Sequence, residues 1–293
     1  MGASAIEFSL DPFSVKFRPC AREPGEWKDE VSKAAFSLIA QAGNRPIIVC
    51  FSGGVDSEVL CRTLFDQGVH FSVLTVKDSN GSNENEVVFT SKWCMSRGIE
   101  QKIIQLDFKD FYENGIERYI GDGYVSANVF RYFQLFLLEE VEALGGYAVL
   151  GGGEPRIGVS EATLPITPYV AFARATLCPF IWLQKNGLEH QPYFYLSSPE
   201  LTLSFLRTPI IETVLRNPEM LRSKMNRYML KHFVQFAYWP DIQIHRKLKN
   251  AEGFNAMRFK IEQELLTRFK KDIQSVRVPI EDLRMQLEGT LKR

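Results

Sequence analysis

The stretch Pro46-Ile-Ile-Val-Cys-Phe-Ser-Gly-Gly-Val-Asp-Ser57 decides how the rest of this 293-residue chain is interpreted. Its apolar beginning is typical of a buried strand, and a segment with helical spacing follows directly from Glu58. Between them, two adjacent glycines allow positive φ and a close approach of the backbone to a ligand. The N–H groups of such a turn, together with the first N–H groups of a helix, attract anions. The junction therefore predicts a phosphate-binding loop.

Polar side chains at the same junction support a phosphate site. The hydroxyl groups of Ser52 and Ser57 can donate hydrogen bonds to phosphate oxygens. Asp56 can either cap the helix or hold Mg²⁺ beside a polyphosphate. A plain tight turn with a helix cap is the alternative, but it does not account for serines, glycines and aspartate at one junction. The sequence lacks G-x-x-x-x-G-K-[ST] and G-x-G-x-x-G here, which argues against a Walker A loop and a dinucleotide fingerprint.

Ser52-Gly-Gly-Val-Asp-Ser57 resembles the S-G-G-x-D-S signature of the PP-loop ATP pyrophosphatases, and the resemblance covers about residues 45–155. It implies that ATP, with Mg²⁺, is cleaved between its α and β phosphates to adenylate a substrate for attack by a nitrogen or sulfur nucleophile. Asp56 is then a catalytic residue and the Mg²⁺ ligand. The residues implied to hold the nucleotide at this loop are Ser52, Gly53, Gly54, Val55, Asp56 and Ser57.

Strand and helix patterns alternate through the first half of the chain, which predicts a doubly wound, mostly parallel α/β sheet of the adenine nucleotide alpha hydrolase-like type with a helical C-terminal cap. We expect an N-terminal strand or hairpin with a helix at 1–45, a nucleotide-binding core at 46–158 and a C-terminal region at 159–293. Strands are expected at 46–51, 69–76, 103–108 and 147–150, and helices at 26–42, 56–67, 85–97, 111–120 and 127–144.

Two further loops fall at expected strand ends, where ligands bind in open α/β sheets. Before the polar loop at 77–86, the resemblance places Thr75 and Val76 beside the adenine, mainly through backbone groups, and makes Lys77 a candidate for neutralising developing charge. Asn83 and Glu86 face either the substrate or a metal ion, or else belong to a solvent-exposed loop.

Three consecutive glycines follow the fourth expected strand. They form either a simple tight turn or a close backbone approach to the nucleotide, and the resemblance favours the second. Arg156 is a candidate catalytic residue for charge neutralisation. The candidate nucleotide-binding residues of this loop are Gly151, Gly152, Gly153 and Glu154.

Beyond residue 160 the alternation stops. Asn186-Gly187 between two hydrophobic runs predicts a hairpin over 179–195, and helices are expected at 200–206, 210–216, 219–236 and 253–271. Residues 216–293 contain 17 Lys and Arg against 9 Asp and Glu, a balance of +8. This basic part, with Arg246, Lys247 and Lys249, either binds RNA or is a solvated helical surface.

The remaining composition narrows the class of protein. The five cysteines form no C-x-x-C pair, which is typical of reduced thiols in a cytoplasm and disfavours zinc and paired-thiol chemistry. No segment reaches the roughly 18 apolar residues of a membrane helix. The main hypothesis is an adenylating ligase, and an oligomer is possible. The alternatives are a tRNA or nucleic-acid base modification enzyme and a non-catalytic nucleotide sensor.

A finer placement rests on two short segments. Tyr238-Trp-Pro-Asp241 and Gly253-Phe254 resemble the distal part of phage- and bacterium-encoded PP-loop proteins. They suggest a position near the asparagine synthetase and phosphoadenosine phosphosulfate reductase branches, and a phage-encoded protein would act in the host cytoplasm.

Overall fold

A four-stranded parallel sheet with the order β5-β4-β3-β6 lies at the centre of one half of the protein. The computed structural model describes residues 4–10, 13–121, 126, 128–160, 166–242, 251–269 and 275–289. The strands are β3 (Ile47–Cys50), β4 (Ser72–Asp78), β5 (Gln101–Leu106) and β6 (Tyr147–Leu150). This order and the parallel pairing confirm the expected α/β class.

Different helices cover the two faces of the parallel sheet. All four residues of β3 are buried, as a central strand requires. Because side chains alternate along a strand, Ile47 and Val49 enter the hydrophobic cluster shared with two helices, and Ile48 and Cys50 enter the cluster on the opposite face. The first face carries α1 (Trp27–Ala42) and α2 (Val55–Asp66), and the second carries α6 (Val129–Ala143).

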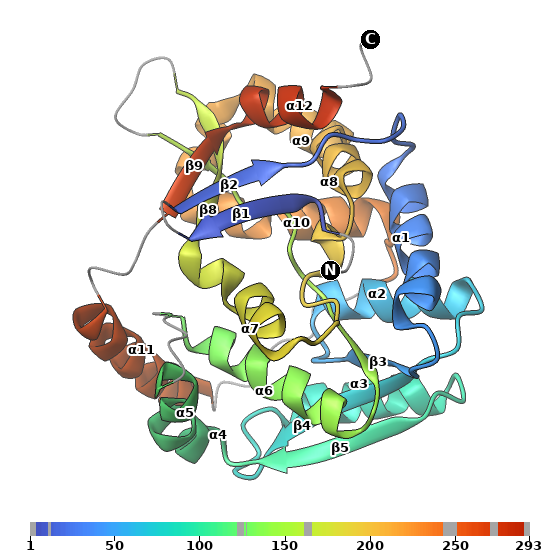
Figure 1. Ribbon diagram of the computed structural model, residues 1–293, viewed down its shortest axis with the longest axis vertical. Helices are drawn as coiled ribbons and strands as arrows, with labels where there is room; N and C mark the ends of the chain where they lie inside the picture. The colour runs from blue at the N-terminus through green and yellow to red at the C-terminus, as the bar shows by residue number, and fades with distance from the viewer. Residues whose placement is uncertain are drawn as a thin grey trace.

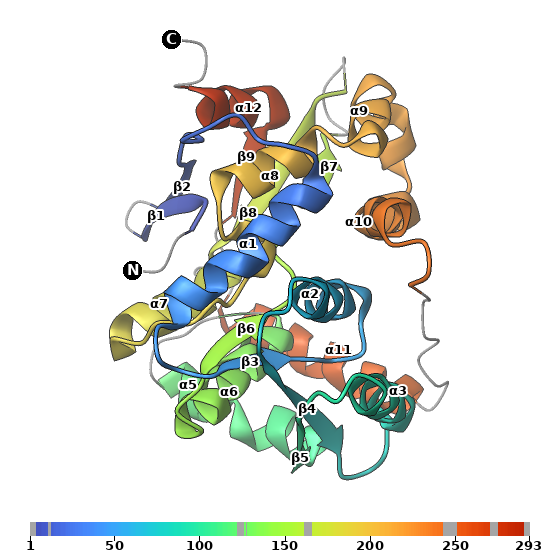
Figure 2. The ribbon, with the colours of Figure 1, turned by 90° about the vertical axis from the view of Figure 1, so that its right-hand side faces the viewer.

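The other elements extend the chain on both sides of this sheet. The expected N-terminal hairpin is confirmed as β1 (Ile6–Leu10) paired with β2 (Phe13–Phe17). Figures 1 and 2 show the parallel sheet in one half of the molecule and the two smaller sheets in the other half, with α10 close to α2. Besides α7 and α12, which are described below, the other helices are α3 (Glu84–Met95), α4 (Phe108–Asp110), η1 (Phe111–Gly115), α5 (Glu117–Gly121), η2 (Arg174–Leu177), η3 (Phe194–Leu196), α8 (Pro199–Leu206), α9 (Pro209–Arg216), η4 (Pro218–Arg222), α10 (Lys224–Tyr238) and α11 (Ala251–Arg268).

The C-terminal region is more than a helical cap. A three-stranded antiparallel sheet forms from β7 (Ile157–Val159), β8 (Pro168–Ala173) and β9 (Ser275–Pro279), and α12 (Ile280–Glu288) follows it. The sequence patterns missed this sheet because its strands are short and β9 pairs with β8 across about a hundred residues of chain. Short segments that pair over such a separation leave little local periodicity to detect.

The predicted hairpin at 179–195 is wrong. Residues Cys178–Asn186 form the helix α7, with Pro179 in its first turn and Gly187 in the left-handed conformation (φ 65°) at its end. Asn186 Nδ2 donates a hydrogen bond to the Trp182 carbonyl oxygen at 2.8 Å. An Asn-Gly pair is compatible with a type I′ turn, but the same positive φ ends a helix equally well, and here it ends a helix.

All five cysteines are buried, and none forms a disulfide bond. None of the helices in the described residues has the length and apolar character needed to cross a membrane. The predicted basic surface with Arg246, Lys247 and Lys249 lies outside the described residues.

His190 gives the fold a pH-dependent contribution to stability. Its Nδ1 accepts a hydrogen bond from the Ala148 N–H at 3.0 Å, and its Nε2 lies 3.1 Å from a Glu142 carboxylate oxygen. Burial of the ring, and then the charge of Arg45, lowers the pKa of His190 to about 4. Protonation of Nδ1 would also break the bond to Ala148. In the unfolded chain the pKa of a histidine is about 6.5, so the unfolded state binds more protons below that pH.

We therefore expect the free energy of unfolding to fall by up to about 3 kcal/mol as the pH drops from about 6.5 to about 4 because of His190. Urea unfolding at a series of pH values measures this slope. His190→Asn keeps an acceptor near Nδ1 but cannot be protonated, so its slope should be smaller, whereas His70→Asn at an exposed position should retain the wild-type slope. Equal slopes in wild type and His190→Asn would contradict this account.

Candidate functional site

The loop at 52–57 has the geometry of an anion site. It joins β3 to α2 at the carboxyl edge of the parallel sheet, and Gly53 adopts φ 72°, which favours glycine. Gly54 is the N-cap of α2, in an extended conformation, and its helix start has no side-chain cap. Asp56 lies inside the first turn and does not cap it. The N–H groups of this turn therefore remain available to a phosphate.

The two serine hydroxyls lie side by side beneath this turn. Ser52 Oγ and Ser57 Oγ are 3.2 Å apart, and Ser57 Oγ donates a hydrogen bond to the Gly54 carbonyl oxygen at 2.9 Å. These contacts hold the loop in shape and keep the hydroxyl groups at the phosphate position that the sequence predicts.

The triple-glycine loop packs directly onto the start of α2. A Cβ atom on Gly151 would lie 2.9 Å from the Ser57 backbone nitrogen, closer than Cβ atoms approach in proteins. A Cβ on Gly153, which has φ 101°, would lie 2.7 Å from Tyr193 Cβ. Close packing therefore requires glycine at both positions, and it places Glu154 beside the 52–57 loop.

Two carboxylates converge beside the loop. Gln235 Nε2 donates to Asp56 Oδ1 at 2.7 Å and to Glu154 Oε1 at 2.9 Å, so one amide group bridges both acids. The Tyr195 hydroxyl donates to the Asp56 carbonyl oxygen at 3.0 Å. The side chain of Glu154 is almost fully buried. Asp56 and Glu154 are therefore held by hydrogen bonds in one cluster.

A lysine from α10 supplies positive charge to this cluster. Lys231 Nζ forms an ion pair with Asp56 Oδ2 and lies 3.9 Å from Glu154 Oε2. Lys231 and Gln235 are one helical turn apart, so α10 presents both side chains on one face. The cluster thus combines two acids, an amide and an ammonium group at the N-terminus of α2.

The protonation states of the two acids differ. Burial raises the pKa of Asp56, but the charge of Lys231 and the hydrogen bonds from Lys231 and Gln235 outweigh it and hold this pKa below the ordinary value. Burial, and then the charge of Asp56, raises the pKa of Glu154 to about 8. Burial opposes the charged form of Lys231, but Glu154 and Asp56 raise its pKa above the ordinary value. The surroundings therefore favour the ionised form of Asp56 and disfavour the ionised form of Glu154.

The residues predicted from the second strand lie apart from this cluster. Lys77 pairs with Glu84 at 2.7 Å. Thr75 and Val76 are both buried in the core. The Thr75 hydroxyl donates a hydrogen bond to the Phe51 carbonyl oxygen at 3.1 Å. Only their backbone groups fit the adenine role, which stays a prediction.

The loop after the second strand also differs in part from expectation. The Asn83 amide donates to the Val76 carbonyl oxygen at 2.8 Å and accepts from the Asp78 N–H at 2.8 Å, so it closes the loop. Glu86 lies against Gly53, and its Oε2 is buried without a hydrogen-bond partner in the described residues. Arg156 is exposed, and its charge acts to lower the pKa of Lys231.

Sequence reasoning missed Lys231, Gln235 and Tyr195. All three come from the C-terminal half, which has no motif linking it to the loop. One feature of the sequence could have indicated two of them. Lys231 and Gln235 are four residues apart in the expected helix at 219–236, so they lie on one helix face beside apolar positions.

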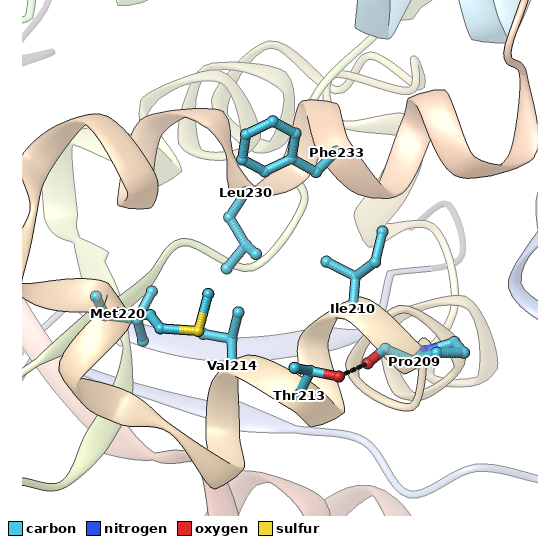
Figure 3. Close-up of a pocket in the computed structure, with 8 residues that line it drawn as sticks. Pro209, Ile210, Thr213, Val214, Met220, Leu230 and Phe233 are labelled. Atoms are coloured by element: carbon cyan, nitrogen blue, oxygen red, sulfur yellow. Dashed lines mark hydrogen bonds between the residues drawn. The ribbon is translucent and has the colours of Figure 1, made fainter.

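The other face of α10 lines an apolar cavity of about 460 Å³. Figure 3 shows Leu230 pointing from α10 toward Val214 of α9, and Phe233 of α10 lines the same cavity. Thr213 also lines the cavity, and its hydroxyl donates a hydrogen bond to the Pro209 carbonyl oxygen at 2.8 Å. The cavity therefore separates α10 from α9 on the side away from Lys231.

Comparisons with known proteins find structural likeness at low sequence identity. NMN synthetase from Francisella tularensis aligns with a TM-score of 0.36 and 11% identity over 84% of this chain and 94% of that chain. A U34-tRNA thiolase from Methanococcus maripaludis aligns with a TM-score of 0.33 and 13% identity over 76% and 83% of the two chains. Glutamine-dependent NAD⁺ synthetase from Acinetobacter baumannii aligns with a TM-score of 0.34 and 14% identity over 50% of this chain.

This chain spans 30% of the length of that NAD⁺ synthetase. No protein-family model matches the sequence, and no curated protein matches it. At these TM-scores the likeness concerns the course of the chain, so the function proposed below rests on the site itself. The phage origin and the finer branch placement stay predictions.

Proposed function

We propose that this protein is an ATP pyrophosphatase that binds ATP in the 52–57 loop and adenylates an oxygen atom of a substrate. The observation that carries the proposal is the meeting of Asp56, Glu154 and Lys231 at the N-terminus of α2. That position combines N–H donors, carboxylates and an ammonium group at the carboxyl edge of a parallel sheet, where ligands of such folds bind.

The residues present fit Mg²⁺. This ion prefers oxygen ligands and is commonly held by one or two carboxylates together with substrate phosphates. Asp56 supplies one such carboxylate and Glu154 supplies a second when it is ionised, and the unpartnered Glu86 Oε2 beside Gly53 is a third acidic oxygen near the loop. Within the described ranges no group of three or more His, Cys, Asp or Glu side chains is placed to hold a metal ion. Bound there, Mg²⁺ would supply positive charge to the phosphate oxygens.

The residues of the chain would then position and neutralise the polyphosphate. A substrate oxygen forms a bond to the α phosphorus, the bond from that phosphorus to the α–β bridging oxygen breaks, and pyrophosphate leaves with the electron pair. The N–H groups of the first turn of α2 hold the leaving pyrophosphate, and Lys231 offsets the charge that develops on it. Such reactions depend mainly on positioning and electrostatics.

Product analysis tests the reaction class. Incubation of the protein with Mg²⁺, γ-labelled ATP and a small-molecule extract should place the label in pyrophosphate, and AMP should follow as the second product when a nucleophile or water displaces it from the adenylated substrate. Label in inorganic phosphate, with ADP, would show that the bond between the β and γ phosphates is cleaved and would overturn the proposal. Tight ATP binding with no turnover would favour the sensor alternative instead.

The identity of the nucleophile, the cytoplasmic location, the domain limits and an oligomeric state remain predictions from the sequence. RNA binding through the basic C-terminal part also stays a prediction, because the lysines and arginine chosen for it lie outside the described residues.

A further inference from the structure

Arg131 is a buried cation without an anionic partner. Its residue exposure is 8%, and Nη1 donates to the Tyr193 hydroxyl at 2.6 Å and to Gln134 Oε1 at 2.8 Å. Both partners are neutral. Nε is buried and has no hydrogen-bond partner, and among the described residues no carboxylate pairs with this guanidinium. Buried charges in proteins are normally paired, because leaving one unpaired costs free energy.

The position of Arg131 in its helix increases this cost. It lies in the first turn of α6, where Asn128 is the N-cap and accepts a hydrogen bond from the Phe130 N–H. The positive end of the helix dipole favours an anion and disfavours a cation at that place. Asn128 already bonds the N–H groups of Phe130 and Arg131, so the group that lacks negative charge from the described residues is the guanidinium.

This unbalanced positive charge lies next to the phosphate-loop region. α6 runs into β6, which is parallel to β3, so the N-terminus of α6 lies toward the carboxyl edge of the sheet. The Arg131 guanidinium carbon is 5.4 Å from the centre of the Tyr193 ring, and Tyr193 Cβ is packed against Gly153. Tyr193 thus separates Arg131 from the triple-glycine loop that carries Glu154.

We propose that Arg131 binds an anionic group, a carboxylate or a phosphate, of the substrate that the 52–57 loop activates. The proposal rests on the proposed function for the role of its ligand, but the anion site itself is separate from the ATP loop. A planar guanidinium with a free Nε edge suits the paired oxygens of either group. The substrate class is then an acid or a phosphate ester.

The test measures anion binding with the phosphate loop disabled. Gly53→Val places a branched side chain at φ 72° and against Glu86, so this variant should lose polyphosphate binding. In that background, inorganic phosphate or acetate, compared with chloride at equal ionic strength, should bind and raise the melting temperature. Adding Arg131→Gln should weaken this binding by about tenfold or more, the usual loss for a charge-assisted hydrogen bond, whereas Arg131→Lys should retain part of it.

Stability without the ligand separates binding from a structural role. In chloride buffer, Arg131→Gln should leave the melting temperature unchanged or raise it, because an unpaired buried charge is removed. Arg118→Gln, at an exposed ion pair with Glu139, is the matched control and should leave anion binding unchanged. Tighter binding of phosphate than acetate would identify a phosphate ester as the substrate, and the reverse would identify a carboxylic acid.

Anion binding that survives Arg131→Gln, or no binding of either anion to the Gly53→Val protein, would overturn the inference. If Gly53→Val does not fold, wild-type protein saturated with pyrophosphate allows the same comparison. The proposed function fails on a different result, namely the absence of ATP or pyrophosphate binding to the wild-type loop.

Discussion

Asp56→Asn is expected to lower pyrophosphate release by about 10³-fold, an effect of the size seen when a group that stabilises transition-state charge is removed. The substitution keeps the shape of the side chain and its acceptor for Gln235 but removes the charge that pairs with Lys231. The fold should survive, because loss of the Asp56 charge removes one of the causes that raise the pKa of Glu154. Glu154 can then ionise and pair with Lys231, which lies 3.9 Å away.

A matched control for Asp56→Asn is available at the surface. Asp241 is also an aspartate in an ion pair, with Arg62, but its side chain is 68% exposed and lies outside the cluster. Asp241→Asn should therefore leave the rate close to that of wild type. Circular dichroism and thermal unfolding establish that both variants fold. A folded Asp56→Asn protein with wild-type pyrophosphate release would remove Asp56 from the site.

Lys231→Gln is expected to lower the same rate by about 10²-fold to 10³-fold, because it removes the ammonium group that offsets charge on the leaving pyrophosphate. It also has a second, separate consequence. Without nucleotide, Lys231 is the cation on the Asp56 carboxylate, so Mg²⁺ must compete with it. Removing the lysine should therefore tighten Mg²⁺ binding to the free protein while it slows the reaction.

Calorimetric titration with Mg²⁺ measures the second effect. A lysine with only a structural role would predict lower stability and no gain in Mg²⁺ affinity. Lys33 pairs with the buried Glu30 on α1, away from the loop, so Lys33→Gln is the control for loss of a lysine beside a buried acid. Unchanged Mg²⁺ affinity together with an unchanged rate in Lys231→Gln would exclude Lys231 from the mechanism.

The loop at 52–57 could be predicted from the sequence, because the residues that form it are neighbours along the chain. The strand, the two glycines and the helix at 46–66 are one continuous pattern, and local geometry determines their shape. The strand-end rule also placed the triple-glycine loop at the same edge of the sheet, and the packing of Gly151 on Ser57 agrees with it.

The rest depends on contacts that no local pattern encodes. Lys231 meets Asp56 from 175 residues further along the chain, and Gln235 from 179. A lysine and a glutamine on an amphipathic helix are ordinary surface residues until tertiary packing brings them onto buried acids. Lys77 shows the converse, because its place at a strand end suggested a role in the site, yet Glu84 on the next helix pairs with it. Asn186-Gly187 was ambiguous for a different reason, since one positive φ serves both hairpins and helix ends.

The most direct test of the central claim is a structure of the protein with Mg²⁺ and α,β-methylene-ATP, which cannot be cleaved between the α and β phosphates. The account predicts the β and γ phosphates against the N–H groups of residues 52–57, with Asp56 on the metal ion and Lys231 turned from Asp56 toward the phosphates. A triphosphate bound elsewhere, with the ion pair between Lys231 and Asp56 intact, would contradict it.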